Sequence, residues 1–158
     1  MIYWLTGQPG SGKTTLSNLL KKELERGRMF TYNVEQLDGD NVRELFKNKD
    51  YSEKGRRYNV DVVQKISHYL LTQGKDVIVS LVSPYKDQRE EFKSIIGDDI
   101  VEIYVHTSEE RERDHFKTDD YQKPTDNFIN IDTTNCTPEE SMVEILVSLK
   151  SKNILHEV

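Results

Sequence analysis

The sequence contains a single cysteine and no long apolar run, and both shortages exclude whole classes of protein. One thiol, that of Cys136, cannot form an internal disulfide and fits a reducing compartment, so we expect a cytoplasmic protein. No apolar stretch approaches the ~20 residues that span a bilayer, so we expect no membrane partner. The apolar start, residues 1–6, lacks the basic flank of a signal peptide and is expected to form a first strand.

Basic residues are fewer than acidic ones. Lys and Arg together number 22 against 28 Asp and Glu, which gives a net charge of −6. Binding to a polynucleotide requires a basic surface, so the charge argues against a nucleic-acid partner. A small phosphorylated ligand needs only a few local cations and remains compatible with this charge. The length favours a single domain over residues 1–158.

Apolar runs typical of strands alternate with stretches of helical periodicity. This alternation predicts an α/β fold, a three-layer α/β/α domain with a five-stranded parallel sheet. We expect strands at residues 2–6, in a segment ending at Leu37, and at 76–82, 100–106 and 128–131. We expect helices at residues 12–26, 41–47, 55–73 and 87–96, a polar helical stretch at 109–114 and a loop at 116–127. A final helix is expected to open with Thr137 as its N-cap, Pro138 in its first position and Glu140 at the third position of a capping box. Polar clusters at residues 7–15, 38–43 and 83–89 follow strands and are therefore expected to face one crevice.

The first of these clusters fits a phosphate-binding loop of the P-loop NTPase type. It reads Gly7-Gln8-Pro9-Gly10-Ser11-Gly12-Lys13-Thr14, between a predicted strand and a predicted helix. Glycines let successive backbone N–H groups point at phosphate oxygens, and the helix start adds a positive dipole end. Lys13 is expected to reach the β- and γ-phosphates of ATP and the Thr14 hydroxyl to coordinate Mg²⁺. The predicted ATP-binding residues are Gly7, Gly10, Ser11, Gly12, Lys13, Thr14 and Thr15.

The second cluster, Asp38-Gly39-Asp40-Asn41-Val42-Arg43, suits the acceptor side of a transfer reaction. A carboxylate there can take the proton of a hydroxyl or help to hold Mg²⁺, and Arg43 can clamp an acidic group. Taken alone, the same run also fits an Asp-Gly turn with a capping aspartate.

Two further groups of polar residues favour an anionic ligand that bears hydroxyls. Arg56 and Asn59 lie three apart on one face of a predicted helix, although a solvated helix face explains them as well. Ser83 precedes a proline at the end of the most apolar strand, and we expect its hydroxyl to lie free at the crevice, although an ordinary turn at the end of a strand explains the residue as well. Arg89, a few residues further on, is expected at the surface.

Together these motifs resemble the adenylylsulfate kinase family, P-loop kinases that phosphorylate the 3′-hydroxyl of adenosine 5′-phosphosulfate. The likeness runs from residue 1 to about residue 150. It rests on the phosphate loop, the Asp-Gly-Asp-Asn-Val-Arg run, Tyr51-Ser52 with Arg56 and Asn59, Ser83-Pro84-Tyr85 with Arg89, Tyr121 with Pro124, and Ile131-Asp132-Thr133-Thr134. The resemblance implies that Asp40 and Lys13 are catalytic. It also implies that Arg43, Arg56, Asn59 and Ser83 contact the acceptor nucleotide, that Tyr51 stacks on its base, and that the protein forms a homodimer.

The chain departs from the family between its last two strands. The family has a longer lid there, with an Asn-Phe-Thr-Gly-Ile-Asp segment whose Phe forms a second wall around the acceptor adenine. Residues 111–122 are far shorter and lack that segment, and nothing in the spacing shows that Phe116 replaces the wall. The acceptor is therefore either adenylyl sulfate or another nucleotide, such as a cytidine diphosphate derivative. Arg111, Arg113 and Lys117 fit either mobile cations over the phosphoryl group or a salt-bridged helix.

The sequence thus predicts a kinase that moves the γ-phosphoryl group of Mg·ATP onto a nucleotide ribose, with a small molecule as its partner. Two other classes stay open. A nucleotide-dependent switch would hydrolyse ATP without an acceptor, and it leaves Tyr51, Arg56 and Asn59 without a role. A polynucleotide or hydroxymethyl-base kinase is disfavoured by the acidic net charge.

Overall fold

A five-stranded parallel sheet organises the protein, and the expected fold class is confirmed. The computed structural model describes residues 1–26, 34–110 and 118–155. The strands lie in the order β2-β3-β1-β4-β5 and every pairing is parallel. Along the chain the elements are β1 (Ile2–Thr6), α1 (Lys13–Glu25), β2 (Val34–Asp38), α2 (Gly39–Leu45), α3 (Glu53–Thr72), β3 (Asp76–Ser80), α4 (Lys86–Ile96), a short 3₁₀ turn (Gly97–Asp99), β4 (Ile100–His106), β5 (Phe128–Asp132) and α5 (Pro138–Ser151).

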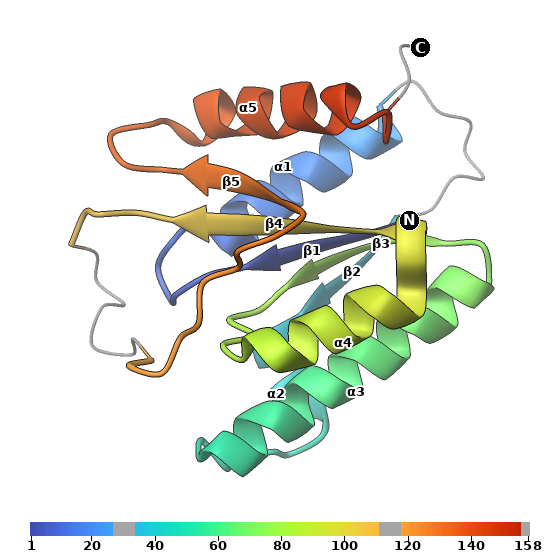
Figure 1. The fold of residues 1–158 in the computed structure, drawn as a ribbon, viewed down its shortest axis with the longest axis vertical. Helices are drawn as coiled ribbons and strands as arrows, with labels where there is room; N and C mark the ends of the chain where they lie inside the picture. Colours follow the sequence, from blue (N-terminus) through green and yellow to red (C-terminus); the bar gives the residue numbers. More distant parts are fainter. Residues whose placement is uncertain (27–33, 111–117, 156–158) are drawn as a thin grey trace.

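Two apolar cores form because helices cover both faces of the sheet (Figure 1). On one face, Leu16, Leu20 and Leu24 of α1 pack with Met142, Ile145 and Leu149 of α5. On the other face, side chains of α2, α3 and α4 pack against the sheet, among them Val42, Val60, Val63 and Phe92. Alternate residues of β1 serve the two cores, since Tyr3 and Leu5 join the first and Ile2 and Trp4 the second. Strand β1 is therefore buried along its whole length.

Local signals account for several element ends. Thr137 and Glu140 form the expected capping box at the start of α5, with Pro138 in its first turn. Gly74 follows α3 with a φ of 75°, a conformation that suits glycine. Helix α2 begins at Gly39, two residues earlier than predicted, because the Asp38 carboxylate accepts hydrogen bonds from the amides of Asp40 and Asn41. Strand β3 ends at Ser80, two residues short of the prediction, because the chain turns away before Ser83.

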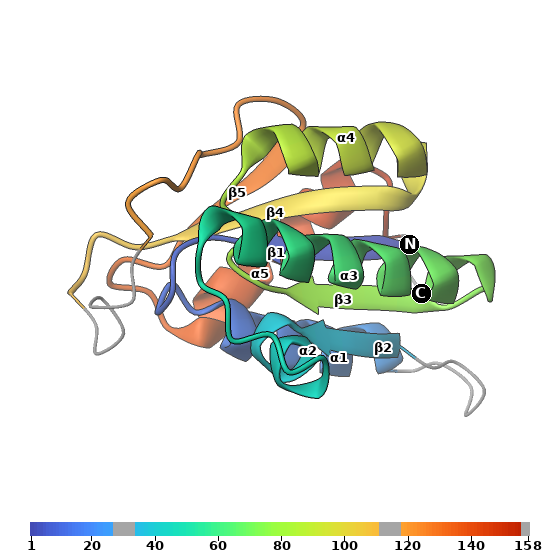
Figure 2. The same ribbon diagram turned by 90° about the horizontal axis from the view of Figure 1, so that it is seen from below.

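All five strands point their carboxyl ends to the same edge, at the left of Figure 1, and Figure 2 shows α3 and α4 side by side across one face. The segments that follow β1, β2 and β3 therefore converge there, as predicted. The connection from β4 to β5 forms neither helix nor strand in its described residues, 107–110 and 118–127. Arg111, Arg113, Phe116 and Lys117 lie outside the described residues. Within the parts described, no helix combines the length and apolarity needed to cross a bilayer.

Candidate active site

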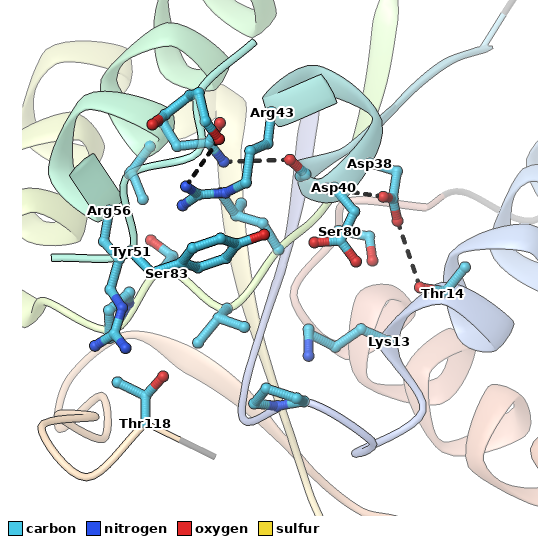
Figure 3. Close-up of a pocket in the computed structure, with 18 of the residues that line it drawn as sticks. Lys13, Thr14, Asp38, Asp40, Arg43, Tyr51, Arg56, Ser80, Ser83 and Thr118 are labelled. Atoms are coloured by element: carbon cyan, nitrogen blue, oxygen red, sulfur yellow. Dashed lines mark hydrogen bonds between the residues drawn. The ribbon is translucent and has the colours of Figure 1, made fainter. Parts of the chain in front are cut away.

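A cavity of about 1310 Å³ opens at this edge of the sheet. Figure 3 shows that its lining comes from separate parts of the chain, with Lys13 and Thr14 on one side and Tyr51 and Arg56 on the other. Asp40 projects between them. The cavity is also lined by Gly10, Gly12, Thr15, Asp38, Arg43, Asn59, Ser80, Ser83 and Thr118. Most predicted site residues therefore meet in one space.

The phosphate loop has the backbone geometry that an anion requires. Gly10 and Gly12 have φ angles of 82° and 102°, which side-chain-bearing residues rarely adopt. A Cβ on Gly7 would lie 2.0 Å from the Val105 carbonyl oxygen, so only glycine fits between the loop and β4. Helix α1 starts after Gly12 without a capping side chain, which leaves its first N–H groups for a ligand. These features fit a bound triphosphate.

Lys13 is held inside this loop. Its side chain is 8% exposed, and its ammonium group donates to the Gln8 carbonyl oxygen at 2.8 Å and to the Ser11 hydroxyl at 3.5 Å. Loop contacts thus pre-position the cation at the mouth of the phosphate cradle. A point charge there can neutralise phosphate oxygens as they gain charge.

Asp38 lies beside Thr14 of the cradle, and Asp40 follows it in the first turn of α2. The Thr14 hydroxyl donates to Asp38 Oδ2 at 3.4 Å, while Asp38 Oδ1 accepts from the Asp40 amide at 3.0 Å. The capping interpretation of this run is thus correct for Asp38, and it leaves Asp40 exposed at the cavity. No group of three or more metal-binding side chains occurs in residues 1–26, 34–110 and 118–155. A hydroxyl with one or two carboxylates still fits Mg²⁺, which takes most of its ligands from phosphates and water.

Arg43 supports an aromatic platform at the far end of the cavity. Its guanidinium lies 4.5 Å from the centre of the Tyr51 ring and donates to the Asp50 carbonyl oxygen at 2.8 Å. Tyr51 itself is 66% exposed. With Arg43 against it, the ring is fixed as a surface on which a flat base can stack.

Asn59 and Gly39 tie α3 to α2 beneath Asp40. The Asn59 side chain is buried and donates to the Gly39 carbonyl oxygen at 3.2 Å. A Cβ on Gly39 would come within 2.5 Å of Leu81 Cβ, so glycine lets α2 start directly above the β3 turn. This packing sets where Asp40 points. Arg56, one turn before Asn59, also lines the cavity.

Ser83 occupies the turn after β3, and Arg89 anchors that turn. Ser83 is 2% exposed, has a φ of 45°, and its Oγ has no hydrogen-bond partner in the described part of the chain. The expectation that Arg89 is a surface residue is wrong. It is 2% exposed, and its guanidinium donates to the Ser83 carbonyl oxygen at 2.6 Å and to Glu102 at 2.7 Å. A buried cation survives there because a buried carboxylate compensates it.

Lys93 completes this buried ion group. Its ammonium donates to Glu102 Oε2 at 2.7 Å and pairs with Glu90 at 2.8 Å. Burial alone would lower the pKa of Lys93, but the hydrogen bonds to Glu102 and Glu90 outweigh it and raise the pKa. The turn that carries Ser83 is therefore held by a buried group of ion pairs.

Several residues at the site had no motif to mark them. Gln8 of the phosphate loop pairs with Thr118, and Asp120 contacts Arg56. These residues fall in a polar stretch without periodicity or at a variable position of the loop pattern. Only their partners far along the chain distinguish them.

Comparison with known proteins agrees with this geometry. The adenylylsulphate kinase family model matches residues 1–145. The adenylyl-sulfate kinase of Oceanobacillus iheyensis is 34% identical over 174 residues, covering 98% of this chain and 86% of the relative. That of Staphylococcus haemolyticus is 33% identical over 175 residues, with the same coverage of 98% and 86%. The hexameric APS kinase of Thiobacillus denitrificans superposes with a TM-score of 0.79 at 26% identity, covering 99% of this chain and 30% of that one. The chain belongs to the adenylylsulphate kinase family and is an ATP-dependent phosphotransferase.

Proposed function

We propose that the protein transfers the γ-phosphoryl group of ATP to the 3′-hydroxyl of adenylyl sulfate. One observation carries this proposal: a phosphate cradle and an aromatic platform share one cavity, and an exposed carboxylate, Asp40, projects between them. The names of the relatives support adenylyl sulfate as the acceptor. The single, exposed cysteine fits a cytoplasmic setting, where ATP is supplied. The homodimer that the family resemblance implies stays a prediction.

The proposed chemistry depends mainly on position and charge. Phosphoryl transfer passes through a loose transition state, so holding donor and acceptor in line lowers the barrier most. Lys13 and the loop amides hold the β- and γ-phosphates. Thr14, with Asp38 beside it, would hold Mg²⁺, which neutralises charge on the phosphate oxygens when bound. Asp40 orients the acceptor hydroxyl and takes its proton.

A cytidine diphosphate derivative is the second candidate acceptor. The observation that favours it is the short connection from β4 to β5, which lacks the family's second aromatic wall. Tyr51 offers one stacking face, and any base can stack on it. Adenine selectivity therefore needs a further contact. A switch that hydrolyses ATP alone would need neither Tyr51 nor Arg56.

The test measures ADP release with Mg·ATP and each acceptor in turn: adenylyl sulfate, cytidine diphosphate derivatives and other nucleotides. We expect saturable turnover with adenylyl sulfate and little release without an acceptor. Turnover with a cytidine diphosphate derivative alone would make that compound the substrate. Release that no acceptor accelerates would overturn the kinase assignment in favour of a switch.

Asp40→Asn provides the matched test of the mechanism. We expect it to lower turnover by more than about 100-fold, because the proton acceptor is lost, and to leave ATP affinity nearly unchanged in calorimetry. Asn41→Ala, at the next exposed position of α2, is the control and should retain activity. Near-normal turnover of Asp40→Asn would remove Asp40 from the mechanism.

A further inference from the structure

Residues 118–122 contact three separate segments of the chain at the active site. This stretch, here called the brace, lies between β4 and β5 and forms neither helix nor strand. The sequence predicted only a loop there. In the structure its side chains and backbone bond to the phosphate loop, to helix α3 and to the turn that carries Ser83.

At the side of the phosphate loop, the brace is held by two hydrogen bonds between Gln8 and Thr118. Gln8 Nε2 donates to the Thr118 carbonyl oxygen at 2.7 Å, and the Thr118 amide donates to Gln8 Oε1 at 3.0 Å. A side-chain amide thus pairs with a backbone amide, 110 positions away in sequence. Thr118 is buried, and both residues adjoin the cradle that holds Lys13. The second contact at this end joins the Tyr121 hydroxyl to Thr6 Oγ1 at 2.9 Å.

At the side of helix α3, the brace makes its contacts through the Asp120 carboxylate. Its Oδ1 accepts from Arg56 at 3.1 Å, and its Oδ2 accepts from the Tyr85 hydroxyl at 2.9 Å. Burial and the hydrogen bond to Asp120 raise the pKa of Tyr85, so its phenol remains the proton donor. Arg56 projects into the cavity in Figure 3. Asp120 therefore fixes the direction of an arginine that faces the proposed acceptor.

Gln122, the last residue of the brace, joins it to the turn that carries Ser83 and to the buried Arg89. The backbone N–H of Gln122 donates to the Pro84 carbonyl oxygen at 2.8 Å, and the backbone carbonyl oxygen of Gln122 accepts from Arg89 at 2.6 Å. Arg89 is the buried cation that also holds Ser83. The brace is thus attached to a part of the protein that cannot move without breaking buried ion pairs.

We propose that residues 118–122 set the phosphate loop in register with helix α3, with Gln8 and Asp120 as the positioning residues at the two ends. Neither residue needs to touch the reacting atoms. In-line transfer demands a near-attack distance between the γ-phosphorus and the acceptor hydroxyl, and small displacements are costly. This inference rests on the proposed kinase function but not on which nucleotide is the acceptor.

The kinetic test uses Asp120→Asn, Gln8→Leu and the double variant, with the acceptor that the wild type uses best. Asp61→Asn is the control. Asp61 forms an ion pair with Lys65 within helix α3, and its side chain is 43% exposed, close to the 47% of Asp120. We expect each single variant to lower kcat about tenfold at saturating substrates, and Asp61→Asn to change it little.

The double variant distinguishes a brace that couples the two positions from two local contacts that act independently. Among the described residues Gln8 and Asp120 share no hydrogen-bond partner, so independent effects would multiply. A brace predicts that the double variant is about as slow as the slower single variant, because release of either end already loses the register. If Asp120→Asn raises only the KM for the acceptor, Gln8→Leu only that for ATP, and the effects multiply, the proposal is wrong.

Hydrogen exchange tests the brace by a measurement that does not depend on catalysis. In Asp120→Asn we expect faster amide exchange in the phosphate loop as well as in α3, and no such change in Asp61→Asn. Exchange that quickens only at the start of α3 would overturn the proposal even if the wild type transferred no phosphate. A wild type that lacks transfer but shows the coupled exchange would instead overturn the proposed function and keep the brace.

Discussion

The donor and acceptor halves of the active site are built in different ways. The proposed donor half comes from one contiguous stretch, residues 7–15, which combines Lys13 with the uncapped backbone N–H groups at the start of α1. The proposed acceptor half draws its side chains from α2, α3, the segment between them and the turn after β3. Its contacts span long stretches of chain, such as the 64 positions between Arg56 and Asp120.

The two halves should therefore respond differently to substitution. The donor half depends on conformations that glycine permits, so few changes are tolerated there. The acceptor half depends on pairs of side chains, each of which can change together with its partner. A family can therefore keep one donor site while the residues on its acceptor side vary.

The largest effect is expected in the donor half. Lys13→Ala should lower turnover by about 10³-fold or more, because the loop loses its only side-chain cation aimed at the transferred phosphate among residues 7–15. Steady-state ADP release measures this change. Lys22→Ala, an exposed lysine in the last turn of the same helix, is the control and should behave like the wild type. A small loss in Lys13→Ala would break the comparison, since the donor half would no longer dominate.

The next effect concerns the base of the acceptor half. Arg89→Leu should reduce the free energy of unfolding by about 3 kcal/mol, because it leaves the buried Glu102 carboxylate with Lys93 as its remaining cation. Urea unfolding measures the loss. Arg26→Leu, whose side chain is 80% exposed, should change stability little. Equal stability of the two variants would mean that the ion group does not support the Ser83 turn.

The smallest effect is expected at the aromatic platform. Tyr51→Ala should raise the KM for the acceptor about tenfold, since stacking of a base on an aromatic ring contributes about 1–3 kcal/mol. The KM for ATP should stay near the wild-type value. Tyr51→Phe keeps the ring and should restore acceptor binding, while Tyr69→Ala removes a similarly exposed tyrosine of α3 away from the cavity. If Tyr51→Ala and Tyr69→Ala behave alike, Tyr51 is no platform.

Most of the fold followed from patterns in the sequence. Strand β4 was predicted at its observed bounds, and the capping box of Thr137 and Glu140 was predicted residue by residue. The phosphate loop was found from its glycines and Lys13. The interpretation failed at Arg89, where a charged residue on a helix is usually exposed, and it found no structure in residues 118–122.

The elements, the phosphate loop and the Thr137 cap of α5 could be predicted from the sequence alone, because each depends on interactions between residues close together in the chain. Only the tertiary structure decided that Arg89 is buried against Glu102, that Arg43 lies against Tyr51, and that Gln8 and Asp120 bond at the two ends of the brace. The physical reason is that a polar side chain far from its partner in sequence has many possible partners. The arrangement of the sheet and its helices in space selects one of them.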